Sequence, residues 1–379
     1  SGHSRNRTGT YTCQKDPAAY TSTYGCPCSG RRRSHRTGTG PAADTTAAEI
    51  TAEAAAEETT AEAAEGVKIA DGEYTIGIGQ FAEHGSLDNC RTGFLEGLKE
   101  AGIEEGVNLT VLFDNAQADT ATASMISDNY VSQKVDLICA IATPSAMSAY
   151  NSCLDSDIPV IYTAVSDPVS AGLVADLNAP GANITGTSDE LDTTAVMKLI
   201  TAASPDVKKI GLLYDKSQDS SKVPVADAIA YCEENGIEYI EKTGTTNAEV
   251  SAAADALVAE GVDAVFTPTD NTIMTAELAI FEKFADAKIP HYTGADSFAL
   301  NGAFLGYGVN YTELGTATAD MAADILVNGA DPAATAVRTL DSGIVTVNTE
   351  TAAAVGIDDS VFKDMCEELK EVTTAEEFE

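Results

Sequence analysis

The chain has 379 residues and carries 59 acidic against 22 basic side chains, a formal net charge of −37. Nucleic acids and anionic membrane surfaces repel such a body, and a uniformly acidic surface by itself selects no particular ligand. The length is sufficient for two lobes of ordinary domain size, and no apolar run approaches the roughly 18 residues that a membrane span requires. A globular α/β protein is therefore expected.

The N-terminal region differs in composition from the rest of the chain. Residues 1–44 hold seven Arg or Lys and two Asp, a net charge of +5, so the other 335 residues carry −42. Residues 41–66 are an Ala/Thr/Glu run without hydrophobic periodicity. Such a stretch buries too little apolar surface to offset the entropy of ordering. Residues 1–73 are therefore predicted to be a disordered head and an acidic low-complexity tether, and the folded body is expected to begin at Tyr74.

From Tyr74 the chain alternates strand-like and helix-like segments. The strand candidates are residues 74–80, 107–114, 135–142 and 158–165, and segments with helical spacing or a polar helical composition lie between them. Strands that are separated by crossover helices pair in parallel. This order predicts a parallel, doubly wound sheet.

The same order of segments recurs in the second half. Residues 210–212 (IGL) stand 134 positions after residues 76–78 (IGI), and the Gly-Ile pair at 236–237 stands 134 positions after the pair at 102–103. VDAVFTP and IPHYTGAD then repeat VDLICAIATP and IPVIYTAVSD, at offsets of 127 and 131. The repeat predicts two copies of one β/α lobe.

The repeat and the expected path of the chain predict two β/α lobes with parallel sheets, between which the chain crosses more than once. The predicted first lobe comprises residues 74–185 and 311–337, and the second comprises residues 186–306 and 342–371. The chain is expected to cross between them near residues 183–186, 307–312 and 338–347, and to end in a helix after about residue 358. A ligand would be captured by closure of the lobes about these crossings.

Five of the eight cysteines fall within the predicted body, each alone in an apolar context. They are Cys90, Cys139, Cys153, Cys232 and Cys366. Isolated cysteines in such contexts are typical of buried thiols, and their spacing suits neither a metal site nor a disulfide framework. No metal site and no structural disulfide is expected in the body.

The ligand crevice of an open α/β sheet lies outside the carboxyl ends of its strands. Polar residues gather at these ends in both copies: Gln80, Phe81 and His84, Thr143 to Ser145, Ser166 and Asp167 in the first, and Asp215 to Ser220, Thr269 to Asn271, Asp296 and Ser297 in the second. Hydroxyls and the amides that begin helices suit a carboxylate, and the Asp side chains suit an ammonium. Phe81, Tyr307 and Tyr311 offer flat apolar contact, so an amino acid, particularly an aromatic one, fits this set.

Each of these residues also has a structural interpretation. Ser, Thr, Asp or Asn before a helix is equally explained as an N-cap, a lone His as a hydrogen-bonded core residue, and an aromatic side chain as packing. The chain contains no G-x-S-x-G, no Walker-type G-x-x-x-x-G-K-[ST], no H-E-x-x-H and no G-x-G-x-x-G dinucleotide turn. No catalytic residue, cofactor or enzymatic activity is therefore expected.

The segments IGIGQFAEHGSLDNCRTGFLEGLKEAG, VDLICAIATPSA, PVIYTAVSDPVSAGLV, NITGTSD, VFTPTDNTI and GYGVNYTELG resemble the tryptophan/phenylalanine-type ABC transporter substrate-binding proteins. The resemblance covers about residues 74–357. It implies the type I periplasmic-binding fold, with two Rossmann-like lobes joined by a multi-strand hinge, and capture of an amino acid, often aromatic, between the lobes. The contacts it implies are Phe81, His84, Thr143, Ser145, Ala146, Ser166, Asp167, Thr187, Ser188, Asp189, Asp270, Asn271 and Asp296. Asp219 joins them where relatives commonly have Glu, since this chain reads YDKSQDSS at residues 214–221.

The resemblance also implies partners and a location. ABC permease and ATPase subunits would receive the ligand from an exported protein at the extracellular face of the cell membrane, lipid-anchored through its N-terminal region and touching the membrane only through that tether. A monomer without nucleic-acid partners is expected. Neither Cys26 nor Cys28 follows the apolar run of a lipobox, so a tag, a mis-called start or a reading-frame slip can also explain the head. A ligand-sensing regulatory domain of the same fold, or an importer subunit for another small solute, is the alternative function.

Overall fold

The computed structural model describes residues 72–340 and 342–375. The predicted head and tether therefore lie outside the described residues, apart from residues 72 and 73. The first lobe is built on a sheet of six parallel strands in the order β11-β5-β4-β3-β1-β2. Its strands are β1 (Tyr74–Gln80), β2 (Leu109–Asn115), β3 (Leu137–Ile141), β4 (Val160–Thr163), β5 (Ile184–Ser188) and β11 (Arg338–Thr339). The central strands β3 and β4 are buried throughout, as expected for a parallel sheet covered on both faces.

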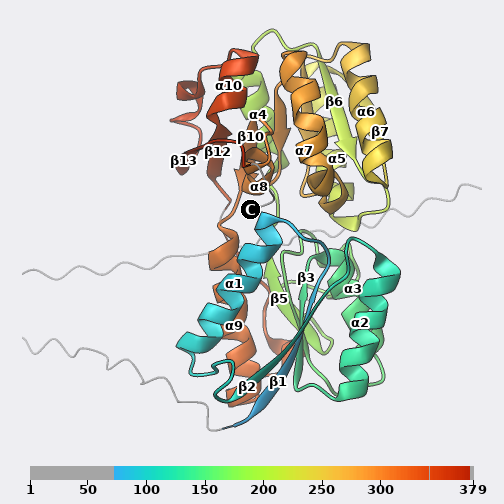
Figure 1. The fold of residues 1–379 in the computed structure, drawn as a ribbon, viewed down its shortest axis with the longest axis vertical. Coiled ribbons are helices and arrows are strands. Elements are labelled where there is room, and N and C mark those ends of the chain that lie inside the picture. The colour runs from blue at the N-terminus through green and yellow to red at the C-terminus, as the bar shows by residue number, and fades with distance from the viewer. Residues whose placement is uncertain (1–71, 341, 376–379) are drawn as a thin grey trace, which may run out of the picture. The chain divides into compact units, whose positions relative to one another are not determined.

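The second lobe is built on a sheet of seven strands in the order β13-β12-β10-β9-β8-β6-β7, parallel except where β12 runs antiparallel to β10. Its strands are β6 (Lys209–Tyr214), β7 (Glu238–Thr243), β8 (Ala264–Thr267), β9 (His291–Thr293), β10 (Leu305–Gly308), β12 (Ile344–Asn348) and β13 (Glu368–Val372). Figure 1 shows the two sheets in separate lobes. The predicted α/β class with two Rossmann-like lobes is confirmed.

The sequence repeat reappears as an identical pairing register. Ile76 pairs with Leu137 in the first lobe, and Ile210 pairs with Ala264 in the second. Ile210 stands 134 positions after Ile76, and Ala264 stands 127 positions after Leu137, which are the offsets of the sequence repeat. The strand order β2-β1-β3-β4-β5 of the first sheet likewise matches β7-β6-β8-β9-β10 of the second. The carboxyl ends of corresponding strands therefore occupy corresponding positions in the two lobes.

Ten α-helices and three short 3-10 helices occur in the described residues. The first lobe contains α1 (Gly85–Glu100), α2 (Thr120–Gln133), α3 (Thr143–Cys153), α9 (Tyr311–Asn328) and η2 (Pro332–Ala334), and the second contains α4 (Thr193–Ala203), η1 (Asp219–Ser221), α5 (Lys222–Asn235), α6 (Asn247–Glu260), α7 (Asn271–Asp286), α8 (Asp296–Leu300), α10 (Thr349–Val355) and η3 (Asp359–Phe362). None of these helices is both long and apolar enough to cross a membrane.

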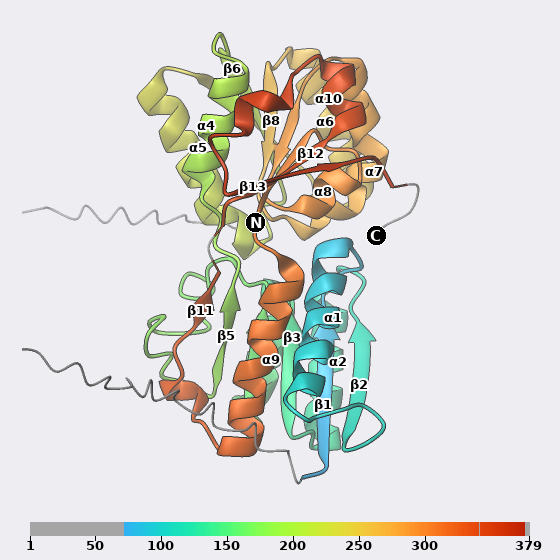
Figure 2. The same ribbon diagram turned by 90° about the vertical axis from the view of Figure 1, so that its left-hand side faces the viewer.

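Helix α9 returns to the first lobe and packs against α1, as Figures 1 and 2 both show. Small residues make this approach close. A β-carbon on Gly93 of α1 would lie 2.0 Å from the carbonyl oxygen of Thr312, and one on Gly315 of α9 would lie 2.1 Å from that of Cys90. Because neither gap admits a methyl group, the two glycines set the spacing of the helices and thereby hold α9 in the first lobe.

The chain crosses between the lobes at three points: between β5 and α4, between β10 and α9, and between β11 and β12. The predicted lobe boundary after residue 185 falls inside β5. This strand continues to Ser188 because Gly186 packs directly on Tyr162, where a β-carbon would lie 2.1 Å from the carbonyl oxygen, and because Thr187 pairs with Arg338. The first crossing therefore begins at Asp189.

The predicted closing helix after residue 358 is wrong. Between residues 359 and 375 the structure has the short η3, and β13 follows as the edge strand of the second sheet. The ELKEV segment of β13 has helix-forming composition, but its pairing with β12 decides its conformation. Propensity is a weak prior that such tertiary pairing overrides.

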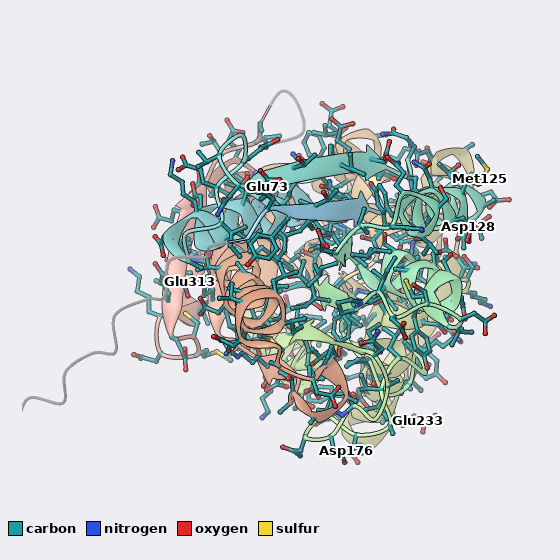
Figure 3. All side chains as sticks on the ribbon, turned by 90° about the horizontal axis from the view of Figure 1, so that it is seen from below. Glu73, Met125, Asp128, Asp176, Glu233 and Glu313 are labelled. Atoms are coloured by element: carbon teal, nitrogen blue, oxygen red, sulfur yellow. The ribbon has the colours of Figure 1, made fainter. Side chains whose placement is uncertain are left out.

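Four of the five body cysteines are buried as predicted, and Cys366 is the exception. Cys90, Cys139, Cys153 and Cys232 are buried free thiols, whereas Cys366 is partly exposed. Acidic side chains such as Asp128, Asp176 and Glu233 are exposed and lie at the edge of the view in Figure 3. Their charge is therefore solvated and is separate from the buried carboxylates described below.

Replacing Gly93 by Ala tests the spacing of α1 and α9. The added methyl group must displace the backbone of α9, so we expect the free energy of unfolding, measured by urea denaturation, to fall by about 1–3 kcal/mol. Glu96→Ala, on the exposed face of the same helix, is the matched control and should change the value by less than about 0.5 kcal/mol. Equal stability of both variants would contradict the proposed spacing role.

Candidate ligand site between the lobes

A small cavity lies where the carboxyl ends of the two sheets face each other. The first lobe contributes His84, Ser86, Leu87, Thr143, Ala164, Ser166, Asp189 and Tyr311, and the second contributes Ser220, Thr269, Asp270, Asn271, Met274, Ala295 and Phe298. This is the location that parallel sheets favour for a small-molecule site.

Three of the five helices that begin at this cavity have no side-chain cap, whereas Asp270 and Asn310 cap the other two, α7 and α9. In α1, α3 and α8 the N-cap residues are His84, Ala142 and Ala295, and none of their side chains caps the first turn. By contrast, Asp, Thr or Asn side chains cap α2, α4, α6, α9 and α10. The first-turn N–H groups of α1, α3 and α8 therefore remain available to an anionic group of a ligand.

The backbone is strained at the wall of the cavity. Ala142, immediately before α3, has φ of 81°, and the cavity-lining Ala164 has φ of 55°. Non-glycine residues rarely adopt such values, and each costs on the order of 1–3 kcal/mol. Strain of this kind is concentrated at functional sites, and here it orients the start of α3 and the loop after β4.

Three polar atoms of the lining are buried and have no hydrogen-bond partner in the part of the chain that the structure describes. They are Nδ1 of His84, Oγ1 of Thr143 and Oγ of Ser220. Thr143 is the first residue of α3, Ser220 lies in η1, and η1 contacts α3 across the cleft. A buried polar atom that makes no hydrogen bond costs about 1–3 kcal/mol. Both lobes therefore direct unsatisfied hydrogen-bonding capacity toward the same small space.

Asp189 is the buried carboxylate of the first lobe. Its side chain is only 6% exposed, and its two oxygens accept hydrogen bonds from the hydroxyls of Ser166 at 3.1 Å and Tyr311 at 3.0 Å. Burial raises the pKa of Asp189, and these two hydrogen bonds oppose the shift. No Lys or Arg occurs among the described residues that line the cavity. A cationic group entering the cavity would therefore supply the counter-charge that Asp189 lacks.

Asp270 is also buried, but its oxygens are used within the protein. One accepts from the N–H groups of Thr272 and Ile273 as the N-cap of α7. The other accepts from the N–H of Asp215 at 2.7 Å and the hydroxyl of Ser221 at 2.6 Å. Burial nevertheless raises the pKa of Asp270 to about 6. With four donors already bound, Asp270 has a structural role in joining α7 to the loop after β6.

Direct hydrogen bonds join the two lobes around the cavity. His84 lies 3.1 Å from Oδ1 of Asn271, and the hydroxyl of Ser166 lies 2.9 Å from that of Thr269. The hydroxyls of Ser86 and Ser297 are 2.5 Å apart. Each pair takes one residue from each lobe. The structure is therefore a closed form in which the cavity is covered on both sides.

Six of the fourteen predicted contacts line the cavity: His84, Thr143, Ser166, Asp189, Asp270 and Asn271. Asp296 lies behind the wall, where one of its oxygens is 3.5 Å from the hydroxyl of Ser86. Phe81 and Asp219 line a neighbouring groove of about 850 Å³ that also touches Thr143. Asp219 also pairs with Lys222.

The side chains of the other five predicted contact residues bond or pack elsewhere in the first lobe. The hydroxyl of Ser145 donates to the carbonyl of Gly79, Ala146 is buried in the core, Asp167 accepts from the N–H of Ser170, Thr187 bonds Thr163 and Thr318, and Ser188 donates to the carbonyl of Ser166. These residues brace the loops that carry the cavity wall.

Of the larger apolar side chains in the lining, the sequence predicted only Tyr311. Leu87, Met274 and Phe298 face the cavity from the first or second turn of α1, α7 and α8. Leu87 and Met274 stand three or four residues after predicted strand-end residues, namely His84 and Asp270 or Asn271. Helical spacing from a strand end is therefore a signal by which Leu87 and Met274 can be found, whereas Phe298 stands only two residues after the predicted Asp296.

Among the described residues, no cluster of three or more His, Cys, Asp or Glu side chains has the geometry to hold a metal ion. The fold, the facing strand ends and the closed cavity define a two-lobed binding protein. The family of ABC transporter substrate binding proteins matches the chain over residues 75–367. The chain therefore belongs to this family, and its fold is the type I periplasmic-binding fold.

Three similar proteins illustrate the family. A relative from Clostridioides difficile (strain R20291), called a tyrosine-binding protein, is 38% identical over 280 residues, which are 74% of this chain and 80% of the relative. A structure from Streptococcus pneumoniae in complex with L-Trp is 32% identical, with a TM-score of 0.73 over 78% of this chain and 99% of that one. A ligand-free, open substrate-binding protein with adhesive properties from Clostridium difficile is 37% identical, with a TM-score of 0.61 over 80% of this chain and all of that one.

The burial of His84 predicts a pH dependence of stability. Desolvation lowers the pKa of His84 from 6.5 to about 4, whereas an unfolded imidazole titrates near 6.5. Between these values only the unfolded chain binds the proton, so acid favours unfolding. The contribution of His84 is complete above pH 6.5 and is lost as the pH falls toward 4, by on the order of 3 kcal/mol.

The comparison of wild type with His84→Gln isolates this effect, because Gln does not titrate. The free energy of unfolding of both proteins should be measured between pH 4 and 7. We expect the difference between them to grow with pH up to about 6.5 and then to level off. Parallel curves across the whole range would show that His84 is not held neutral by burial.

Proposed function

We propose that this protein captures a zwitterionic amino acid, most favourably an aromatic one, in the cavity between its lobes and delivers it to an ABC importer. The observation that carries the proposal is the Asp189 carboxylate, buried without a basic partner in a cavity that also holds unpartnered hydroxyls. Thr143 and Ser220 contribute those hydroxyls from opposite lobes. A ligand that carries one positive and one negative group satisfies both features.

The proposed assignment of the charged groups follows from their chemistry. The ammonium group binds Asp189, since charge-assisted hydrogen bonds are the strong ones and the carboxylate oxygens accept only one protein hydrogen bond each. The carboxylate binds at the start of α3, where the Thr143 hydroxyl, the Ser220 hydroxyl and uncapped N–H groups converge. The helix dipole of α3 favours the same placement.

The apolar lining supports an aromatic side chain. Leu87, Met274, Phe298 and the ring of Tyr311 offer packing surface, and sulfur and aromatic groups are favourable neighbours of a ring. The names of two relatives agree with this assignment, since one is called tyrosine-binding and the other was solved with L-Trp. Phe81, which the sequence offered as an aromatic contact, has no part in this assignment.

The closed arrangement of the lobes supports capture by hinge closure. The TM-score is 0.73 against the L-Trp complex and 0.61 against the ligand-free, open protein. The sequence identity is nevertheless higher to the open protein. In the proposed cycle the ligand binds an open form and joins the two lobes. The protein acts without catalysis as a monomer outside the cell, tethered to the membrane by its N-terminal region, and hands its ligand to the permease and ATPase subunits.

Calorimetric titration of the full chain with each amino acid tests this function. We expect saturable binding of at least one aromatic amino acid. Asp189→Asn should weaken that binding roughly 10- to 100-fold, because the neutral amide loses the charge-assisted bond to the ammonium group. The measured quantity is the dissociation constant of the wild type and of each variant.

Asp167→Asn is the matched control. This carboxyl group also follows a strand of the first lobe, but it accepts from the N–H of Ser170 outside the cavity. The dissociation constant of the variant for the amino acid should therefore match that of the wild type within about 2-fold. Absence of heat with all twenty amino acids, or equal weakening by the two substitutions, would contradict the proposed function.

A further inference from the structure

A chain of hydrogen bonds runs through the second lobe and ends at His84. Its members are the side chains of Asp215, Thr272, Gln218, Asn271 and His84, all of which are buried. Three of the links within the second lobe are 2.7 to 2.9 Å long, and the last link, between Asn271 and His84, is 3.1 Å and spans the cleft. Gln218 and Asp215 do not line the cavity, so their influence on a ligand passes through Asn271 and His84.

The carboxylate of Asp215, at one end of this series of hydrogen bonds, determines the direction of every bond in the series. Asp215 only accepts, so the hydroxyl of Thr272 donates to it and accepts in turn from Nε2 of Gln218. Gln218 then presents Oε1 to Asn271, whose Nδ2 donates to it at 2.9 Å. Asn271 is left with Oδ1 facing His84. An amide oxygen cannot donate, so Nε2 of His84 must carry the hydrogen.

This direction fixes the tautomer of the imidazole. A neutral imidazole carries one N–H hydrogen, and the series of hydrogen bonds places it on Nε2. Nδ1 is therefore a lone-pair acceptor. It is buried, it has no protein partner, and its ring lines the ligand cavity. Desolvation lowers the pKa of His84 to about 4, so the ring remains neutral at physiological pH.

We propose, resting on the function proposed above, that His84 is a specificity-determining residue whose Nδ1 accepts a hydrogen bond from an N–H or O–H group on the side chain of the bound amino acid. Tyrosine and tryptophan carry such a donor, and phenylalanine does not. Gln218 is a positioning residue in this account, because it orients Asn271 and thereby the imidazole.

The donor comes from the side chain of the ligand because the ammonium group has a better partner. Asp189 is a carboxylate and attracts a cation far more strongly than a neutral imidazole does. Phenylalanine would bury Nδ1 against a hydrocarbon ring and leave the acceptor unsatisfied. Sites built around one hydrogen bond reject the analogue that lacks the donor, so the expected preference for tyrosine is roughly 10- to 100-fold.

The test measures dissociation constants of the full chain for L-tyrosine, L-tryptophan and L-phenylalanine by titration calorimetry. Wild type should bind phenylalanine 10- to 100-fold more weakly than tyrosine. His84→Gln places an amide N–H near the position of Nε2, which keeps the donor to Asn271, but it has no acceptor at the position of Nδ1. This variant should lose affinity for tyrosine and gain affinity for phenylalanine, which no longer leaves a buried acceptor unsatisfied, so the preference disappears.

Equal affinity of the wild type for tyrosine and phenylalanine would overturn the inference while amino-acid capture stands. Equal losses for both ligands in His84→Gln would also overturn it, since they would indicate a merely structural role. If the wild type bound none of the three amino acids, both the proposed function and the inference on His84 would be overturned. A nitrogen-15 spectrum of the wild-type imidazole adds a readout independent of the variant: protonation at Nε2 is expected, and protonation at Nδ1 would contradict the proposed tautomer.

Discussion

The negative charge of Asp189, buried between the lobes, is the constraint on which the account of this site depends. The first crossing begins at this residue, directly after β5. The loop after β4 supplies Ser166 and α9 supplies Tyr311 to hold its oxygens. Two hydroxyl donors do not neutralise a carboxylate removed from water, and the described lining offers no basic side chain. The charge is therefore best accommodated when the ligand itself provides a cation.

The same residues line the ligand cavity and hold the two lobes together. His84, Ser86 and Ser166 line the cavity, and each bonds a residue of the opposite lobe. A ligand that contacts these side chains therefore contacts the groups that hold the lobes together. The close packing of α1 on α9 keeps His84 and Tyr311 on one rigid body. Ligand recognition can in this way be converted into a change of shape that a transporter reads.

The sequence predicts the fold well because its signals are local and repeated. Offsets of 134 and 127 positions between the two halves correspond to equivalent pairs in the two sheets, so the strand ends could be placed correctly. The site was predicted less well, because an Asp after a strand can either cap a helix or face a ligand. Asp189 and Asp270 are indistinguishable by composition, and only the four donors around Asp270 separate their roles. Phe298 reaches the cavity from the short helix α8 and stands at helical spacing from neither predicted residue of that strand end, Asp296 or Ser297.

A crystal structure of the protein with L-tyrosine bound is the most direct test of the central claim. The account predicts that the ammonium nitrogen lies about 2.8 Å from a carboxylate oxygen of Asp189, with the ligand carboxylate at the start of α3. A ligand bound with its ammonium group away from Asp189, or one seated in the outer groove beside Phe81 and Asp219, would contradict it.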